Sequence, residues 1–242
     1  MQLTTKAIVL TSLKYSDTSL IVRAYTASDG LKSYMLKGVL ASKKGKVRAA
    51  HFQPLTQLEL VAVHRNSGNL ERIKEAKVLY PYQSLHTDFV KSSMALFLAE
   101  VLANSLLEET ADSAMFDFLE TVLLWLDTHD SISNFHLGFL LELTKYLGFY
   151  PDDSEAHLDY FDLLSGGFVA KPSLNPMLDG EILGVFKALL GTNFDVVHQV
   201  KLRKEQRQEL LRRLLLYFEL HLHGFRKPKS LEVLQDVFEH YI

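Results

Sequence analysis

The chain has 242 residues, of which 48% are hydrophobic, so it is long enough to bury a core in one large domain or two small ones. It contains no cysteine, which excludes disulfide bonds, thiolate zinc sites and thiol nucleophiles. The formal net charge is only −3, but residues 1–80 carry 13 Lys and Arg against 5 Asp and Glu. Residues 81–170 carry 2 Lys and Arg against 15 Asp and Glu, and residues 171–242 carry 11 Lys and Arg against 9 Asp and Glu. A basic first third favours a polyanionic partner. The alternative is that the charged residues form solvent-exposed faces, and that the two signs are separated along the chain by chance.

No targeting or membrane segment is expected. The opening residues, Met1 to Lys6, lack a basic stretch followed by a long apolar one, which a signal peptide requires. Apolar runs such as Met94 to Ala99 are too short to span a bilayer. With no disulfide framework either, the sequence predicts a soluble cytoplasmic protein without a membrane partner.

Five segments rich in β-branched residues, separated by polar turns, predict strands in the first third. Asp29 and Gly30 form one turn signal, because both readily take positive φ. The last two strands are joined around Asn66-Ser67-Gly68. Short strands with polar turns predict a small antiparallel barrel or sandwich. The strands are expected at 4–14, 18–26, 31–39, 56–65 and 69–79.

Near Pro81 the hydrophobic period changes from that of strands to that of helices. Asn134 is a candidate N-cap and Gly148 a candidate C-cap. Residues 151–180 are rich in Pro, Gly and Asp and predict an ordered loop with a short hairpin around Gly166-Gly167. The fold class is therefore α+β, with a β domain over 1–80 and an all-helical domain over 81–242. Helices are expected at 84–108, 111–126, 134–147, 179–190, 204–223 and 229–240.

A basic loop runs from Gly38 to Arg48. A phosphate loop of the P-loop type needs four residues between its glycines and a Ser or Thr after the Lys. Here six residues separate Gly38 from Gly45, and Val47 follows Lys46, so a nucleotide site is not expected. Flexible cations instead suit contact with phosphates, which releases counterions. The predicted loop contacts are Lys37, Lys43, Lys44, Lys46 and Arg48.

Cations also alternate with aromatic residues on the predicted strands. Arg23 shares a strand face with Tyr25, and Lys32 shares one with Tyr34. Such surfaces suit single strands of nucleic acid, because bases stack on rings while cations follow the backbone. Taken singly, each tyrosine is better explained as a core residue. The predicted strand contacts are Arg23, Lys32, Arg72 and Lys74.

Two further basic runs lie in the last third. Cations beside apolar helix positions such as Leu202 and Leu210 suit a partner tail that is both acidic and hydrophobic. Glu205 and Glu209 interrupt the first run, so part of it is expected to pair within its helix, and a solvated helix face is the equal alternative. The predicted partner-binding residues are Lys201, Arg203, Lys204, Arg207, Arg226 and Lys227.

No catalytic constellation is evident, and we expect a protein without enzymatic activity. A Gly-x-Ser-x-Gly elbow is absent. His157 with Asp159 and Asp162 comes nearest to a ligand cluster, but it lacks a fourth partner, so no metal or cofactor is expected. The enzymatic alternative is a metal-dependent hydrolase or nuclease that uses acidic residues of the middle segment, such as Asp152 and Asp153.

Several segments stand in a characteristic order and spacing: Lys6 to Leu10, Tyr15 to Leu20, Lys37 to Val39, Gln53 to Leu55, Leu58 to Leu60, Leu141 to Pro151, Tyr160 to Asp162 and Gly166 to Phe168. Together they resemble the bacterial RecO family over essentially the whole chain. Many members carry a four-cysteine zinc site after a Leu-Gly-aromatic-Pro stretch, whereas residues 152–157 of this chain have no cysteine. A structural zinc is therefore not expected, and packing of Tyr160, Phe161 and Phe168 is expected to hold the loop instead.

The resemblance implies an N-terminal five-stranded OB-fold barrel followed by an all-helical C-terminal domain. It implies recombinational DNA repair: binding of single- and double-stranded DNA, strand annealing, and help in loading RecA onto single strands coated by SSB. The implied partners are RecR and the acidic, hydrophobic C-terminal tail of SSB, with the RecA filament reached indirectly. That tail is expected on the two C-terminal basic runs. The alternative is an adaptor that docks acidic partner tails with only weak DNA contact.

Overall fold

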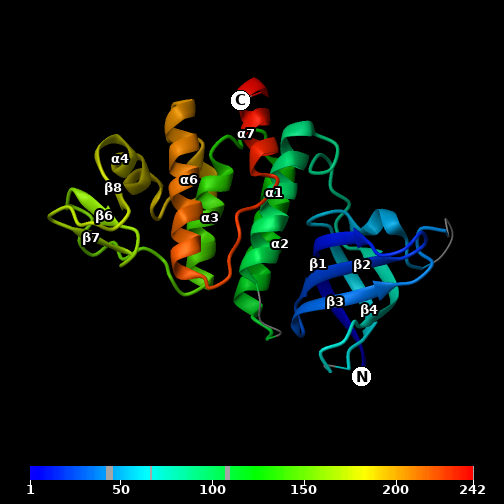
Figure 1. The fold of residues 1–242 in the computed structure, drawn as a ribbon. Coiled ribbons are helices and arrows are strands. Elements are labelled where there is room, and N and C mark those ends of the chain that lie inside the picture. Colours follow the sequence, from blue (N-terminus) through cyan, green and yellow to red (C-terminus); the bar gives the residue numbers. More distant parts are fainter. Residues whose placement is uncertain (42–45, 66, 107–109, 242) are drawn as a thin grey trace. The chain divides into compact units, whose positions relative to one another are not determined.

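The computed structural model describes residues 1–41, 46–65, 67–106 and 110–241 (Figure 1). The chain separates into two compact units. Residues 1–128 and 228–230 form the first, here called the barrel unit. Residues 129–227 and 231–242 form the second, here called the helical unit. In the part that the structure describes, no helix combines the length and the apolarity that a bilayer crossing needs.

A five-stranded sheet forms the centre of the barrel unit. All neighbouring strands of this sheet run antiparallel, in the order β3-β2-β1-β4-β5. Just before β5, Glu71 forms a parallel bridge with Tyr34 of β3, which joins the two edges of the sheet. This is the connectivity of a partly open OB-fold barrel, as predicted. The elements are β1 (Gln2–Lys14), β2 (Leu20–Thr26), β3 (Gly30–Leu36), the short 3-10 helix η1 (Ala49–Phe52), β4 (Gln57–Val63) and β5 (Arg72–Val78).

Burial alternates along the strands and shows which face forms the core. In β2, Leu20, Val22 and Ala24 are buried in the barrel core, whereas Arg23 between them is partly exposed. In β3, Tyr34 and Leu36 belong to the same core. β1 is long enough to pair with both β2 and β4, and its register shifts between Val9 and Thr11. A bulge of this kind bends a strand and increases its twist, which a small barrel requires.

The helices α1 (Phe89–Ser105) and α2 (Ser113–Thr128) belong to the barrel unit. Tyr25, on the outer face of β2, stacks on Phe116 of α2 with ring centroids 6.2 Å apart. Lys6 of β1 pairs with Glu120 of α2 at 2.8 Å. Strands therefore give way to helices close to the predicted change at Pro81, while the compact units divide after Thr128. Domains of 1–80 and 81–242 remain a prediction.

The helical unit contains α3 (Phe135–Tyr146), α4 (Gly180–Leu189), the single turn α5 (Phe194–Val197), α6 (Lys204–His221) and α7 (Leu231–Tyr241). Gly148 follows α3 with φ +82°, a conformation that suits glycine after a helix, as predicted. Asn134 occupies the N-cap position of α3, but its side chain makes no capping bond. The sequence pattern does not predict α5.

A small three-stranded sheet occupies the Pro- and Gly-rich region. Its strands are β6 (Tyr160–Asp162), β7 (Gly167–Val169) and β8 (Met177–Leu178), in the order β7-β6-β8. The predicted hairpin around Gly166-Gly167 is therefore present. Phe161 lies 5.0 Å from Phe168 and 4.7 Å from Phe186 of α4, measured between ring centroids. This packing holds the sheet against α4, and both predicted phenylalanines are part of it.

Candidate functional site

A groove of about 600 Å³, here called the β3–β5 groove, lies between β3 and β5 of the barrel. One end is closed at Glu71, whose N–H donates to the carbonyl of Ser33 at 2.7 Å and whose carbonyl accepts from Met35 N–H at 3.0 Å. Val47, from the segment before η1, also lines the groove, and Ala76 N–H of β5 donates to the carbonyl of the preceding residue, Lys46, at 3.0 Å. Between these bridges β3 and β5 are not neighbours in the described part of the sheet, so side chains form the walls.

Four exposed cations line the β3–β5 groove. Lys37, Arg72 and Lys74 are among the predicted contacts, and the structure brings them together. Lys74 donates from Nζ to Gln2 Oε1. Arg65 completes the set, although the sequence pattern does not single it out, because only the tertiary structure places the β4–β5 loop beside β3. In the sequence, the feature that could have indicated Arg65 as a site residue is its position directly before a predicted turn.

The other predicted loop contacts lie outside the lining of the groove. Arg48 is exposed and occupies the N-cap position of η1. Lys46 is exposed and pairs with Glu75 of β5, which partly neutralises its charge. Lys43 and Lys44 lie outside the described residues.

Lys32 does not lie at the surface as predicted. It shares a strand face with Tyr34, as the alternation indicates, but that face is the interior of the barrel. Lys32 is 4% exposed and Tyr34 is completely buried. Arg23 points outward from β2 but is half-buried, and this burial lowers its pKa. Tyr25 is 3% exposed, and burial raises its pKa to about 12, so both tyrosines are core residues.

Next to the closed end of the groove, three side chains form a buried hydrogen-bonded chain. Tyr34 Oη lies 2.7 Å from His64 Nε2, and His64 Nδ1 lies 2.8 Å from Asp29 Oδ2. A carboxylate accepts hydrogen bonds, so the bond between His64 and Asp29 is donated by His64 Nδ1–H. Burial raises the pKa of Tyr34, and the charges of Asp29 and Glu71 raise it further. These hydrogen bonds therefore connect the β2–β3 turn, which carries Asp29, to His64, directly before Arg65.

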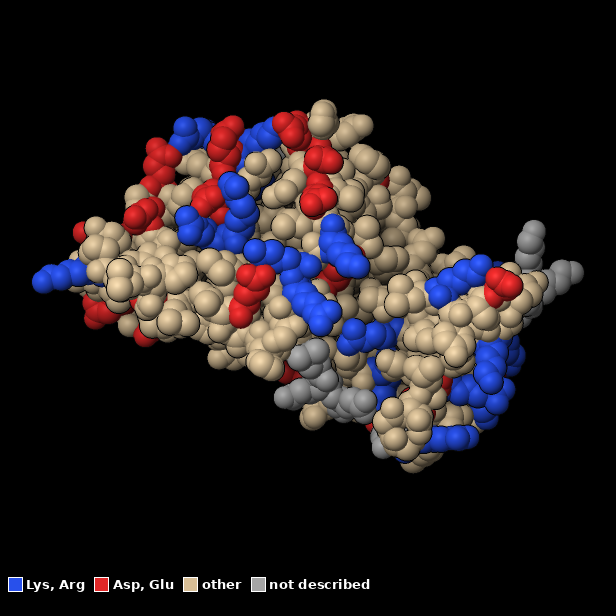
Figure 2. All heavy atoms as spheres, in the orientation of Figure 1, with Lys and Arg blue, Asp and Glu red and all other residues tan. Residues whose placement is uncertain are grey.

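The charge of the barrel is visible on one face of the molecule (Figure 2). Lys and Arg side chains gather over the barrel, with few Asp or Glu among them. Over the helical unit the two signs are intermixed on that face. A surface of one sign produces a potential that attracts a ligand of opposite charge.

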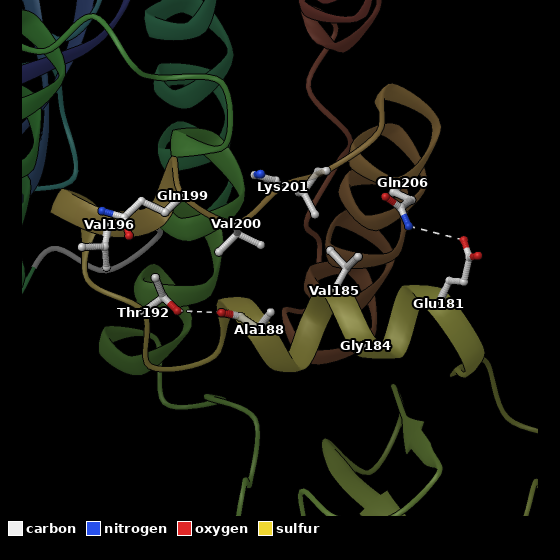
Figure 3. A pocket seen from close by; sticks show the side chains of 11 residues that line it. Glu181, Gly184, Val185, Ala188, Thr192, Val196, Gln199, Val200, Lys201 and Gln206 are labelled. Atoms are coloured by element: carbon white, nitrogen blue, oxygen red, sulfur yellow. Dashed lines mark hydrogen bonds between the residues drawn. The ribbon is translucent and has the colours of Figure 1, made fainter.

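A second groove, of about 720 Å³ and here called the α4 groove, lies in the helical unit (Figure 3). It runs between α4 and residues 192–202, and Val185 and Val200 face its space from the two sides. Lys201 is exposed and lies among the lining residues. Apolar walls beside a cation suit an acidic, hydrophobic peptide. The remaining apolar lining is Ala188, Val196 and Leu202.

The predicted partner-binding cations differ in how available they are. Lys201 has no ion pair among the described residues and lines the α4 groove. Arg203 is exposed, but it pairs with Glu181, which also lines this groove. Lys204 pairs with Glu239 of α7 at 3.0 Å. Lys201 is therefore the cation best placed to meet an acidic ligand in the groove.

Arg207 departs from the prediction of a surface cation. It is 8% exposed and donates from Nε to Asn134 Oδ1 at 3.1 Å, because α6 turns this position toward α3. Arg226 and Lys227 are exposed and lie outside the lining of the α4 groove. Lys227 lies 3.6 Å from Glu219, a loose surface pair.

The candidate ligand cluster at 157–162 does not form. No three His, Asp or Glu side chains converge in the described part of the chain. Asp162 instead accepts four hydrogen bonds, which join the β6–β7 turn to the loop before β8. Burial raises the pKa of Asp162, but the hydrogen bonds together outweigh burial and hold the pKa below its usual range. The donors are Asn175 Nδ2 (2.8 Å), Ser165 N (3.1 Å), Leu164 N (2.8 Å) and Ser173 Oγ (3.2 Å).

Comparison with known proteins supports the resemblance along the whole chain. The family model for the N-terminal part of recombination protein O matches residues 1–82, and the model for its C-terminal part matches residues 86–232. The chain is 50% identical to the DNA repair protein RecO of Christiangramia forsetii and 48% identical to that of Flavobacterium psychrophilum. Both alignments cover 98% of this chain and 100% of the relative. The Bacteroides fragilis relative of the same name is 39% identical over 97% of this chain and 98% of its own length. The chain belongs to the RecO family of DNA repair proteins.

Proposed function

We propose that this chain is a non-enzymatic mediator of recombinational repair that binds single- and double-stranded DNA on its barrel. A role in DNA repair and recombination follows from membership of the RecO family. The DNA contacts, the annealing of complementary strands and the loading of RecA onto SSB-coated strands are the proposal. The observation that carries it is the β3–β5 groove, lined by the exposed cations Lys37, Arg65, Arg72 and Lys74.

Clustered cations on a rigid barrel suit phosphate binding. Each phosphate that a Lys or Arg neutralises releases counterions, so affinity falls steeply as salt rises. Residues 1–80 supply 13 cations against 5 acids, and four of these cations converge on one groove. OB-folds commonly bind oligonucleotides on this kind of surface. Arg48 and Arg23 extend the proposed contact surface beyond the groove, together with Lys43, Lys44 and Lys46 from the basic loop.

Annealing needs no covalent chemistry. Two complementary strands repel each other through their phosphates, and a basic surface that holds both screens this repulsion. The acidic stretch 81–170, with 15 acids against 2 cations, offers no comparable attraction. DNA is therefore expected to bind the first third of the chain rather than this stretch.

The α4 groove is the proposed site for the acidic, hydrophobic C-terminal tail of SSB. Its apolar walls, including Val185 and Val200, bury hydrophobic side chains, while Lys201 attracts the acids. RecR is proposed as a second protein partner. An adaptor that docks such tails and touches DNA weakly is the second candidate, because the α4 groove places the exposed Lys201 beside apolar walls.

The experiment measures fluorescence anisotropy of labelled single-stranded and duplex DNA over a salt series, with and without magnesium. The test variant combines Lys37→Glu with Arg72→Glu. The matched control combines Lys14→Glu with Lys77→Glu, which reverses two exposed barrel cations outside the groove lining. The test variant is expected to lose at least about tenfold in affinity and to show a shallower salt slope, because fewer counterions are released.

Three results oppose the proposal. Equal losses in test and control variants reject the groove as the site. Absence of binding by the unmodified chain at low salt favours the adaptor, which also predicts that Lys201→Glu abolishes function while the groove variant retains it. DNA cleavage that requires magnesium and disappears in the Asp152→Asn, Asp153→Asn variant establishes the nuclease.

A further inference from the structure

A pocket of about 380 Å³, here called the α3–α6 pocket, lies in the helical unit. Its lining includes Asn134 and Arg203, which occupy the N-cap positions of α3 and α6. The N-terminus of a helix carries a partial positive charge and presents N–H groups that suit an anion. Two such ends therefore meet at one pocket, and the side chains around them decide what it can bind.

The charged side chains of the α3–α6 pocket are all of one kind. They are His198, Lys201, Arg203 and Arg207, and no Asp or Glu is among the described lining residues. The side chains of His198 and Lys201 are exposed and have no hydrogen bond or ion pair within the described residues. Arg203 pairs with Glu181, which lies outside the lining. The pocket thus carries an excess of positive charge.

Arg207 distinguishes this pocket from an ordinary basic patch on the surface. Its side chain is buried, and its Nε donates to the neutral amide oxygen of Asn134. Among the described residues, Nη1 and Nη2 have no acceptor and no carboxylate pairs with the guanidinium. Burial lowers the pKa of Arg207, and a buried cation without a counter-ion is costly. A docking protein cannot reach so deep a group, but a small anion that enters the pocket can.

The remaining lining narrows the class of anion. Val200 and Leu202 add apolar surface beside the cations, and Ser133 adds a hydroxyl group. The volume lies at the lower end of the range of clefts that hold small organic ligands. A phosphate monoester carries close to two negative charges at neutral pH, so it gains more from several cations than a carboxylate does. An organic phosphate combines this charge with an apolar part.

We infer that the α3–α6 pocket binds a terminal phosphate monoester, carried by a free nucleotide or by the 5′ end of a strand, with Arg207 and Lys201 on its oxygens. An internal phosphodiester carries only one negative charge and is a weaker match. This site is independent of DNA binding on the barrel, because none of its residues belongs to the barrel unit. It also differs from the α4 groove, whose lining does not include Arg207.

The first experiment measures binding of inorganic phosphate and of adenosine monophosphate to the full chain by isothermal titration calorimetry, at an ionic strength held constant with chloride. Lys201→Gln is expected to weaken both affinities about tenfold, because one charge-assisted contact is lost. The control Lys227→Gln removes an exposed cation outside the pocket lining and is expected to have no effect. Arg207→Lys keeps the interior charge but loses the planar fork, so it is expected to weaken binding at least as much. If circular dichroism shows that Arg207→Lys does not fold, Lys201→Gln carries the test.

A second experiment distinguishes the two sources of the phosphate. Oligonucleotides of one sequence, with a 5′-phosphate or a 5′-hydroxyl, compete with adenosine monophosphate. Competition by the phosphorylated form alone supports the inference with strand ends as the source, and competition by neither form supports it with free nucleotides as the source.

Four results overturn the inference. They are equal competition by both oligonucleotides, absence of binding by phosphate and adenosine monophosphate, equal losses in the Lys201→Gln and Lys227→Gln variants, and displacement of adenosine monophosphate by an acidic peptide with a free C-terminal carboxylate. The last result assigns the pocket to a protein tail. None of them bears on the DNA affinity of the barrel, which the groove variant tests separately.

Discussion

Arg207 Nε donates a 3.1 Å hydrogen bond to Asn134 Oδ1 in the interior of the helical unit. The amide of Asn134 in turn donates to the carbonyls of Val197 and Val200, at 3.2 Å and 2.7 Å. One side chain thus links α6 to the segment that forms a wall of the α4 groove. Arg207 supports this wall from inside and does not offer its charge to a partner.

Removing this link is expected to destabilise the protein. Arg207→Ala leaves the Asn134 carbonyl without its buried donor, which costs about 1–3 kcal/mol in the free energy of unfolding. Arg203→Ala removes an exposed cation and is expected to stay within about 0.5 kcal/mol. Urea unfolding monitored by circular dichroism measures both. Equal unfolding midpoints for the two variants would contradict the structural role of Arg207.

His136 is expected to make the protein sensitive to acid. Its ring is completely buried, both ring nitrogens lack a hydrogen-bond partner in the described residues, and it lies 4.8 Å from the ring of Phe238. Burial, together with the smaller effect of the charge of Arg207, lowers its pKa to about 3. In the unfolded chain the pKa is about 6.5. Between these two values the unfolded state binds more protons than the folded state, so stability falls as pH drops.

This single histidine is expected to lower the free energy of unfolding by about 2 kcal/mol between pH 7.5 and pH 5. The variant His136→Leu has no group to protonate at this position, so its stability is expected to change less over the same interval. Urea unfolding at both pH values measures the difference. The same loss of stability in the variant would show that other groups cause the acid sensitivity.

Asp162 is expected to hold the β6–β8 region without a metal. Asp162→Ala removes the acceptor of four partly buried hydrogen bonds, at a cost of about 1–3 kcal/mol in the free energy of unfolding. Asp159→Ala, at a nearby exposed position, serves as the control. The chelator EDTA is expected to leave the melting temperature of the unmodified chain unchanged. A large drop with EDTA would show instead that a metal stabilises this region.

Lys32 and Lys37 are expected to separate folding from DNA binding. Lys32→Glu places an acid in the barrel interior and is expected to lower the melting temperature or prevent folding. Lys37→Glu changes an exposed groove cation, so it is expected to weaken DNA binding and leave the melting temperature unchanged. Thermal melting and DNA anisotropy on both variants test this. A Lys32→Glu variant that is stable but has lost DNA affinity would show that Lys32 contacts DNA, as the sequence predicts.

Much of the local structure follows from the sequence alone. The alternation around Arg23 and Tyr25 predicts a strand, and the helical period after Pro81 predicts helices, because each element repeats its side-chain direction at a set interval. Gly148 and the hairpin at Gly166-Gly167 are equally local, since they depend on backbone conformations that glycine adopts readily. The excess of basic residues in the first 80 positions can also be counted from the sequence without a structure.

The tertiary structure decided which of two faces becomes the interior and which distant residues meet. Alternation places Lys32 and Tyr34 on one face, but only the curvature of the whole sheet makes that face the core. The same curvature brings the loop that carries Arg65 beside Lys37 and so creates the β3–β5 groove. Asn134 looks like a helix cap from its neighbours, yet packing of α6 gives its side chain other partners. Periodicity is a property of neighbouring residues, whereas burial and convergence depend on contacts between segments far apart in the chain.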